Sequence, residues 1–166
     1  MKEMLDVARR LGYEGVEPRI DVKHAHGVEL SASPARRREL RKLAEDSGIA
    51  LCCVATSCRF ADPKTAESHV ETTLEAIDLA ADVGSPRIRV FGGALGEGVA
   101  RELAINIVAD SLSRVADHAL ARGVTVCMET HDEWTDPAHV AAIMRTVSHP
   151  AIAVNWDIMH PVRQSG

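Results

Sequence analysis

Aromatic side chains are scarce, at only 3% of the 166 residues, and the net charge of −5 leaves no excess of lysine and arginine. A general nucleic-acid binder needs basic surface and rings for stacking, so we do not expect that function. No uninterrupted apolar run is long enough to cross a membrane. The opening MKEMLDVARRLGYEG has an amphipathic helical pattern rather than the apolar core of a signal peptide. We therefore expect a cytoplasmic protein that binds neither nucleic acid nor membrane.

The cysteines lack the paired spacing that is typical of a zinc site. Cys52 and Cys53 are adjacent within an apolar, strand-like run, whereas Cys58 and Cys127 stand alone. We interpret all of them as reduced, mostly structural thiols, which fits a cytosolic protein.

Helical and strand patterns alternate along the chain, and the hydrophobic content of 46% suffices for a core. Apolar spacing predicts helices that end at Gly12, Gly48, Gly84 and Gly123, and a fifth that begins at Asp136 and Pro137. Ser33 and Pro34 have the pattern of a helix start. Strands are expected at 13–20, 49–56, 87–93, 124–129 and 151–157. The alternation predicts a single α/β domain over 1–166, a parallel (β/α) TIM-barrel type with outer helices. Since about five strands are expected where a closed barrel needs eight, the barrel is predicted to be incomplete.

Two of these strands end in an acid followed by a histidine. VTVCMETHDEW (124–134) carries Glu129 and His131, and IAVNWDIMHP (152–161) carries Asp157 and His160. Because side chains alternate along a strand, each acid shares its face with small or polar residues, and the two acids are expected in the same register. Neighbouring strands lie roughly 4.8 Å apart, a spacing that a divalent ion bridges. The alternative is that the acids are ordinary caps or solvated loop residues.

Other polar residues fall near the ends of strands. Glu17 and Arg89 form either a structural ion pair or a contact with substrate, and Arg89 is expected to share its face with Phe91. His26 lies in the loop after the strand that carries Glu17, where it is either a substrate contact or a solvated histidine. The glycine-rich GGALGEG (92–98) lacks the pattern of a nucleotide-binding loop.

The segments GYEGVEPR, RIRVFGG, CMETH and NWDIMHP, in this order, resemble the xylose isomerase-like TIM barrels, a group of sugar phosphate isomerases and epimerases. The resemblance implies a divalent ion (manganese, magnesium, cobalt or zinc) held by Glu129 and Asp157. It also implies that Glu129 acts as acid and base on the substrate carbon, while His160 binds substrate oxygens or stabilises charge. His131 and Arg163 become substrate contacts on the same grounds.

Members of that family complete the site with a His and a second Glu from the last two strands, which are absent here together with the first strand. The leading hypothesis is a metal-dependent isomerase or epimerase of a small sugar or sugar phosphate. A zinc-dependent endonuclease acting at abasic DNA sites shares the Glu and the D-x-x-H, but it needs further histidines that ATSCRF (55–60) does not supply. The third hypothesis is a non-catalytic fragment or assembly module. Exposed strand edges predict a homo-oligomer or a complementing chain.

Overall fold

The computed structural model describes residues 1–22, 24–160 and 162, and over these residues helices alternate with parallel strands. The helices are α1 (Lys2–Arg10), α2 (Pro34–Ser47), α3 (Ala66–Val83), α4 (Arg101–Arg122), the 3-10 helix η1 (Asp132–Trp134) and α5 (Pro137–Val147). The strands are β1 (Gly15–Val16), β2 (Ala50–Leu51), β3 (Val54–Arg59), β4 (Arg87–Phe91), β5 (Thr125–Glu129) and β6 (Ile152–Asn155). Among the helices described, none is long and apolar enough to span a bilayer.

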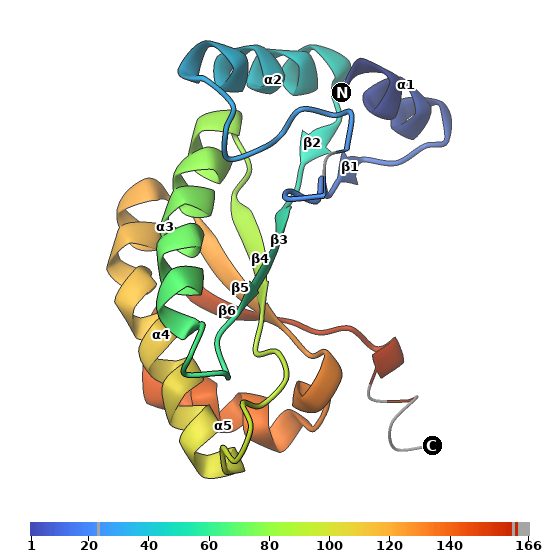
Figure 1. The fold of residues 1–166 in the computed structure, drawn as a ribbon. Coiled ribbons are helices and arrows are strands. Elements are labelled where there is room, and N and C mark those ends of the chain that lie inside the picture. The colour runs from blue at the N-terminus through green and yellow to red at the C-terminus, as the bar shows by residue number, and fades with distance from the viewer. Residues whose placement is uncertain (23, 161, 163–166) are drawn as a thin grey trace.

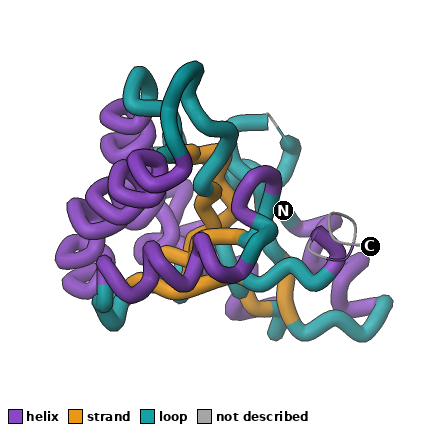
Figure 2. The backbone as a smooth tube through the Cα atoms, turned by 90° about the horizontal axis from the view of Figure 1, so that it is seen from below, coloured by secondary structure: helices purple, strands orange, loops and turns teal. Residues whose placement is uncertain are grey.

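The strands form a four-stranded and a two-stranded parallel sheet, and helices cover one side of the four-stranded sheet (Figure 1). β3, β4, β5 and β6 pair in that order, and β1 pairs with β2 next to them. Viewed at right angles, the helices form an outer layer and the strands an inner one (Figure 2). This is the arrangement of a partial TIM barrel, as predicted.

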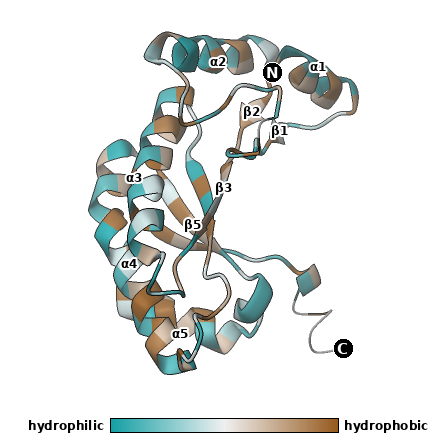
Figure 3. Cartoon of the chain, viewed as in Figure 1, coloured by the Kyte–Doolittle hydropathy of each residue, from teal (hydrophilic) through white to brown (hydrophobic). Residues whose placement is uncertain are grey.

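The main core lies between the sheet and its helices. α3 and α4 mix hydrophilic and hydrophobic residues along their length (Figure 3). Their apolar positions, such as Ile77 and Leu112, are fully buried with Ile88 of β4 and Met128 of β5 in one cluster. The residues on one face of each strand therefore pack in the core, and the alternate residues lie on the inward face of the sheet.

Helix boundaries follow the local signals in the sequence. Ser33 accepts a hydrogen bond from the Arg36 backbone N–H at the start of α2, and Gly48 ends that helix in the left-handed region. Asp136 accepts one from the Ala138 N–H at the start of α5. The four cysteines are free thiols, and burial, then the nearby Glu17 carboxylate, raises the pKa of Cys53 to about 12. Burial supports a structural role for Cys58 and Cys127, whereas Cys52 is exposed.

Three strand predictions need correction. The strand expected at 13–20 reduces to Gly15–Val16, because Pro18 has no N–H to donate to a ladder. The run expected at 49–56 is two strands, since it pairs with β1 through Leu51 and with β4 from Val54. The run expected at 151–157 ends at Asn155.

Candidate active site and metal centre

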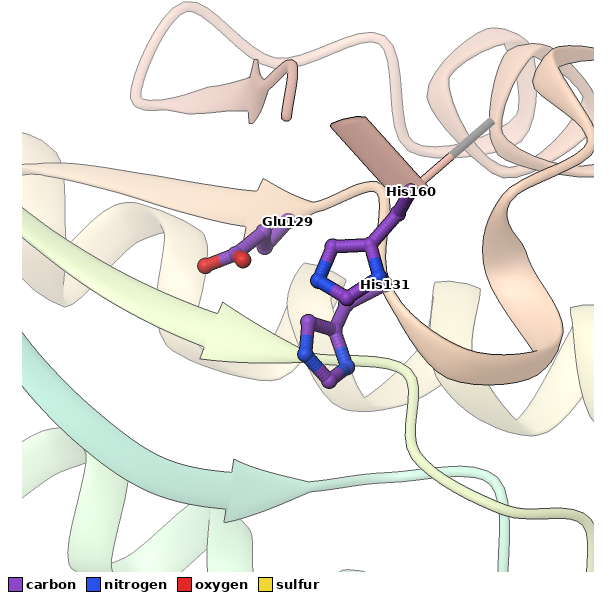
Figure 4. A group of neighbouring side chains, drawn as sticks. All are labelled: Glu129, His131 and His160. Atoms are coloured by element: carbon purple, nitrogen blue, oxygen red, sulfur yellow. The ribbon is translucent and has the colours of Figure 1, made fainter. Parts of the chain in front are cut away.

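Three side chains meet at the C-terminal end of β5. Glu129 is the last residue of that strand, His131 lies two residues later, and His160 comes from the helical segment after β6 (Figure 4). One potential ligand atom from each lies within 4.8 Å of the others. The end of β5 thus brings together one carboxylate and two imidazoles, although Glu129 and His160 are 31 residues apart in the chain.

Aromatic contacts fix the two imidazoles. The ring centroids of His131 and His160 lie 4.0 Å apart, and the ring of Phe91 meets His131 edge-on at 5.1 Å. The Nδ1 atom of His131 is buried without a hydrogen bond, although the Asp132 carboxylate lies 2.7 Å away in poor alignment. The side chain of His131 therefore has an acidic neighbour at Nδ1, while one of its ring nitrogens lies within 4.8 Å of a Glu129 oxygen.

Glu129 is held by an arginine from the neighbouring strand. Its Oε2 atom forms an ion pair with Arg89 Nη1 at 2.8 Å and accepts a hydrogen bond from the Asn155 amide at 3.4 Å. The same arginine donates from Nε to Glu17 at 2.8 Å, and its guanidinium lies 4.6 Å from the Phe91 ring centroid. Arg89 and Phe91 therefore share a face, as predicted. Of the two alternatives for Glu17 and Arg89, the ion pair is present.

The expectation that Glu129 and Asp157 share a register is wrong. Glu129 pairs with Asn155, and Asp157 lies two residues beyond the end of β6. The chain leaves the ladder because the Asp157 carboxylate closes a turn, with Oδ1 accepting from the N–H groups of Met159 (2.7 Å) and His160 (3.4 Å). These bonds, the Met159 N–H first, hold the pKa of Asp157 below its ordinary value.

Asp157 nevertheless stays beside the cluster. Its Oδ2 atom lies 3.7 Å from His160 Nε2, and its N–H donates to Thr130 Oγ1 at 2.9 Å. Thr130 lies between Glu129 and His131, so it ties the turn after β6 to the end of β5. Metal ligation by Asp157 remains a prediction.

His26 does not lie free in the loop. It is only 7% exposed, so the expectation of a solvated histidine is wrong. Its Nδ1 accepts from the Val28 N–H at 3.0 Å, which leaves Nε2–H to donate to the Arg19 carbonyl at 3.1 Å. Both ring nitrogens thus serve the backbone, and substrate contact by His26 stays a prediction. The other predicted contact, Arg163, lies outside the described residues.

Sequence patterns did not reveal the role of Trp134. Its fully buried indole donates to the Gly93 carbonyl at 2.7 Å, and the Arg101 guanidinium lies 5.0 Å from the ring centroid. Glu133 pairs with Arg101 at 3.2 Å. The glycine-rich loop is therefore anchored to the segment that carries His131. A tryptophan three residues after His131 was the only signal in the sequence.

The donor set fits a divalent metal. One carboxylate oxygen and two imidazole nitrogens are ligands that zinc, cobalt and manganese share, so the set does not select one ion. Ligand atoms of the three side chains lie within 4.8 Å of one another, which supports this fit.

The fold and this cluster define a class: a parallel α/β barrel type with a carboxylate and imidazole site at the C-terminal ends of its strands. Within that class, the chain belongs to the xylose isomerase-like TIM barrel family, whose model matches residues 5–166. No curated protein matches the sequence.

Solved structures show the same fold at low sequence identity. D-psicose 3-epimerase with D-fructose has a TM-score of 0.80 and 16% identity over 98% of this chain and 60% of its own. The probable 3-DHS dehydratase AsbF of Bacillus anthracis has a TM-score of 0.78 and 20% identity, over 100% of this chain and 60% of its own. A xylose isomerase-like TIM barrel protein from Mycobacterium smegmatis in complex with magnesium has a TM-score of 0.72 and 22% identity, over 98% of this chain and 57% of its own. This chain thus spans less than two thirds of the length of each.

Proposed function

We propose that the chain carries the metal-binding part of a divalent-metal-dependent isomerase or epimerase that acts on a small sugar or sugar phosphate. The observation that carries the proposal is the cluster of Glu129, His131 and His160 at a strand end. Epimerases among the structural neighbours support the substrate class.

Glu129 has the position to move a proton at the substrate carbon, because its Oε1 atom accepts no hydrogen bond from the described residues while Oε2 is held by Arg89. We propose that His160 donates to a substrate oxygen and that His131, whose ring centroid lies 4.0 Å from that of His160, contacts the same group. Asp157 and Glu129 are the proposed carboxylate ligands. A bound divalent ion would supply Lewis acidity that polarises the hydroxy-carbonyl unit.

The family's full ligand set includes a His and a second Glu from strands that these residues do not contain. We therefore propose that turnover requires those strands. A non-catalytic assembly module remains the second candidate, and it is favoured by the exposed edge of β6 and the exposed side chain of Val154.

The first test is metal binding by calorimetry with manganese, magnesium, cobalt and zinc. Glu129→Gln and Asp157→Asn should each weaken binding at least tenfold, whereas Glu67→Gln, an exposed carboxylate paired with Arg114 on the helical layer, should not. Unchanged affinity in both site variants would exclude this metal site.

Turnover separates the two candidate functions. The chain, alone and with added strands of the barrel, is assayed on a panel of ketoses, their phosphates and a dehydratase substrate, because the neighbours include both epimerases and a dehydratase. Metal-dependent epimerisation or isomerisation supports the enzyme. Metal binding without turnover under any of these conditions supports the assembly module.

A further inference from the structure

Arg89 lies between two carboxylates from different strands. Its Nε donates to Glu17 Oε1, and its Nη1 forms an ion pair with Glu129 Oε2, both at 2.8 Å. The arginine side chain is 13% exposed and that of Glu129 10%, whereas that of Glu17 is 37% exposed. The guanidinium therefore has one well-buried partner and one partner near solvent.

The contacts of Glu129 fall on a single oxygen. Arg89 Nη1 forms an ion pair with Oε2, and Asn155 Nδ2 donates a hydrogen bond to the same atom. Within the described part of the chain no donor reaches Oε1. A carboxylate whose one oxygen is fixed by a rigid guanidinium presents the other in a defined direction.

Several contacts keep the guanidinium in place. The Phe91 ring lies 4.6 Å from it on the same strand, and Arg89 pairs with Cys127 of β5, two residues before Glu129. Glu17, which follows β1, accepts a hydrogen bond from the Nε atom of the same guanidinium. With both carboxylates charged, the three groups together carry a single negative charge, which remains attractive to a cation.

We propose that Arg89, anchored by Glu17, is a positioning residue: it fixes Oε2 of Glu129 so that Oε1 is presented to a divalent cation. The inference rests on the proposed function, since it concerns the same cation. It differs from a substrate contact, because Arg89 acts here through Glu129.

The charge of Arg89 and its proposed positioning role predict opposite effects of Arg89→Met on cation binding. Arg89→Met removes a positive charge, which alone would strengthen cation binding. If Arg89 positions Glu129, the loss of its guanidinium weakens Mn²⁺ binding about tenfold, even though a nearby positive charge has been removed. Arg89→Lys keeps the charge without the paired donors, so it should recover only part of the loss.

Glu17→Gln tests the anchor. Without the Glu17 carboxylate the guanidinium loses its second partner and holds Oε2 of Glu129 less firmly, so Mn²⁺ binding should fall about fivefold. The electron paramagnetic resonance spectrum of the bound ion should also broaden, which the loss of a nearby charge alone would not cause. Arg114 and Glu67 provide the matched control, since they form a two-bond ion pair on the helical layer, at 2.6 and 2.7 Å. Arg114→Met and Glu67→Gln should leave Mn²⁺ affinity within twofold.

The measurements are calorimetry with Mn²⁺ and the electron paramagnetic resonance spectrum of the bound ion, whose line width reports the symmetry of its ligands. Arg89→Met should broaden that spectrum. Parent-like affinity and line width in Arg89→Met, or tighter binding, would overturn the positioning role and leave the proposed function standing. Absence of Mn²⁺ binding by the parent chain would overturn both. Should Arg89→Met fail to fold by circular dichroism, Glu17→Gln decides, and its unchanged affinity counts against the anchor.

Discussion

A single methyl group added at Gly92 should disrupt the anchor between the two loops of the site. A Cβ at this position would stand 2.3 Å from Trp134 Nε1, 2.4 Å from Cδ1 and 2.5 Å from Cε2. Favourable contacts between carbon atoms begin at about 3.5 Å. The indole must therefore retreat by roughly 1 Å, although it is fully buried and its N–H is bonded to the Gly93 carbonyl.

The magnitude follows from two effects. Overpacking a buried site costs about 1–3 kcal/mol. Moving the ring also weakens its hydrogen bond and leaves a buried carbonyl poorly satisfied, at about 1–3 kcal/mol. We expect Gly92→Ala to lower the free energy of unfolding by about 2–4 kcal/mol, which for a chain of this length lowers Tm by roughly 5–15 °C.

The assay is thermal unfolding followed by circular dichroism, with Gly98→Ala as the control. Gly98 has a φ of +74° with no atom within 4 Å of its added Cβ, so it reports backbone strain alone. That strain is worth about 1–2 kcal/mol. In a double variant, Gly92→Ala with Trp134→Leu, the loss in free energy of unfolding should be smaller than the sum of the losses in the two single variants, because the smaller side chain relieves the clash. Equal destabilisation by Gly92→Ala and Gly98→Ala would refute the reasoning.

Two further variants test the surface and the buried histidine. Arg36→Ala should leave activity and Mn²⁺ binding unchanged and shift stability by at most about 0.5 kcal/mol, because Arg36 forms an exposed pair with Glu39 at 2.7 Å; a large loss of turnover would contradict this. Burial lowers the pKa of His26, so the unfolded chain binds more protons and stability is lost as the pH falls below about 6.5. Urea unfolding at pH 7.5 and 5.5 should show a smaller pH dependence in His26→Asn than in the parent, and an equal dependence would show that His26 is not responsible.

Local signals were enough to predict most of the helices. Ser33 and Gly48 bound α2 because a side-chain cap and a left-handed glycine act within a few residues of themselves. Alternation placed Arg89 and Phe91 on one face for the same reason. Strand ends were less predictable, since β6 stops at Asn155 only because the next turn is closed by the Asp157 carboxylate.

The site was predictable in its location and less so in its contacts. Glu129, His131 and His160 were all named from their place after strands, and the structure brings them together. Contacts between distant segments leave no local pattern. The pairing of Glu17 with Arg89 spans 72 residues, so the sequence left it as one of two alternatives. The space that Gly92 leaves for Trp134 had no signal at all, because a glycine's neighbours are set by the tertiary fold.

The edge of β6 leads to the last prediction. β6 pairs only with β5 among the described strands, so its other side offers unpaired backbone groups. Trp156, Ile158 and Met159 follow it, with 70%, 70% and 52% of their surface exposed. An unpaired edge followed by large apolar side chains favours association, because both are then withdrawn from water.

We expect the chain to form dimers or larger assemblies at micromolar concentration, measured by sedimentation equilibrium. Replacing Trp156 and Ile158 by Ser should shift the population toward monomer. The matched control replaces Leu103 and Leu120 by Ser, because these leucines of α4 are 52% and 53% exposed and lie on the helical layer away from the sheet edge. Since burial of one large apolar side chain is worth roughly 1.5–3 kcal/mol, loss of the two should weaken association at least tenfold. A parent chain that sediments as a monomer and unfolds cooperatively would show that this edge needs no partner, and equal shifts in both double variants would mean that association uses exposed apolar surface in general rather than the end of β6.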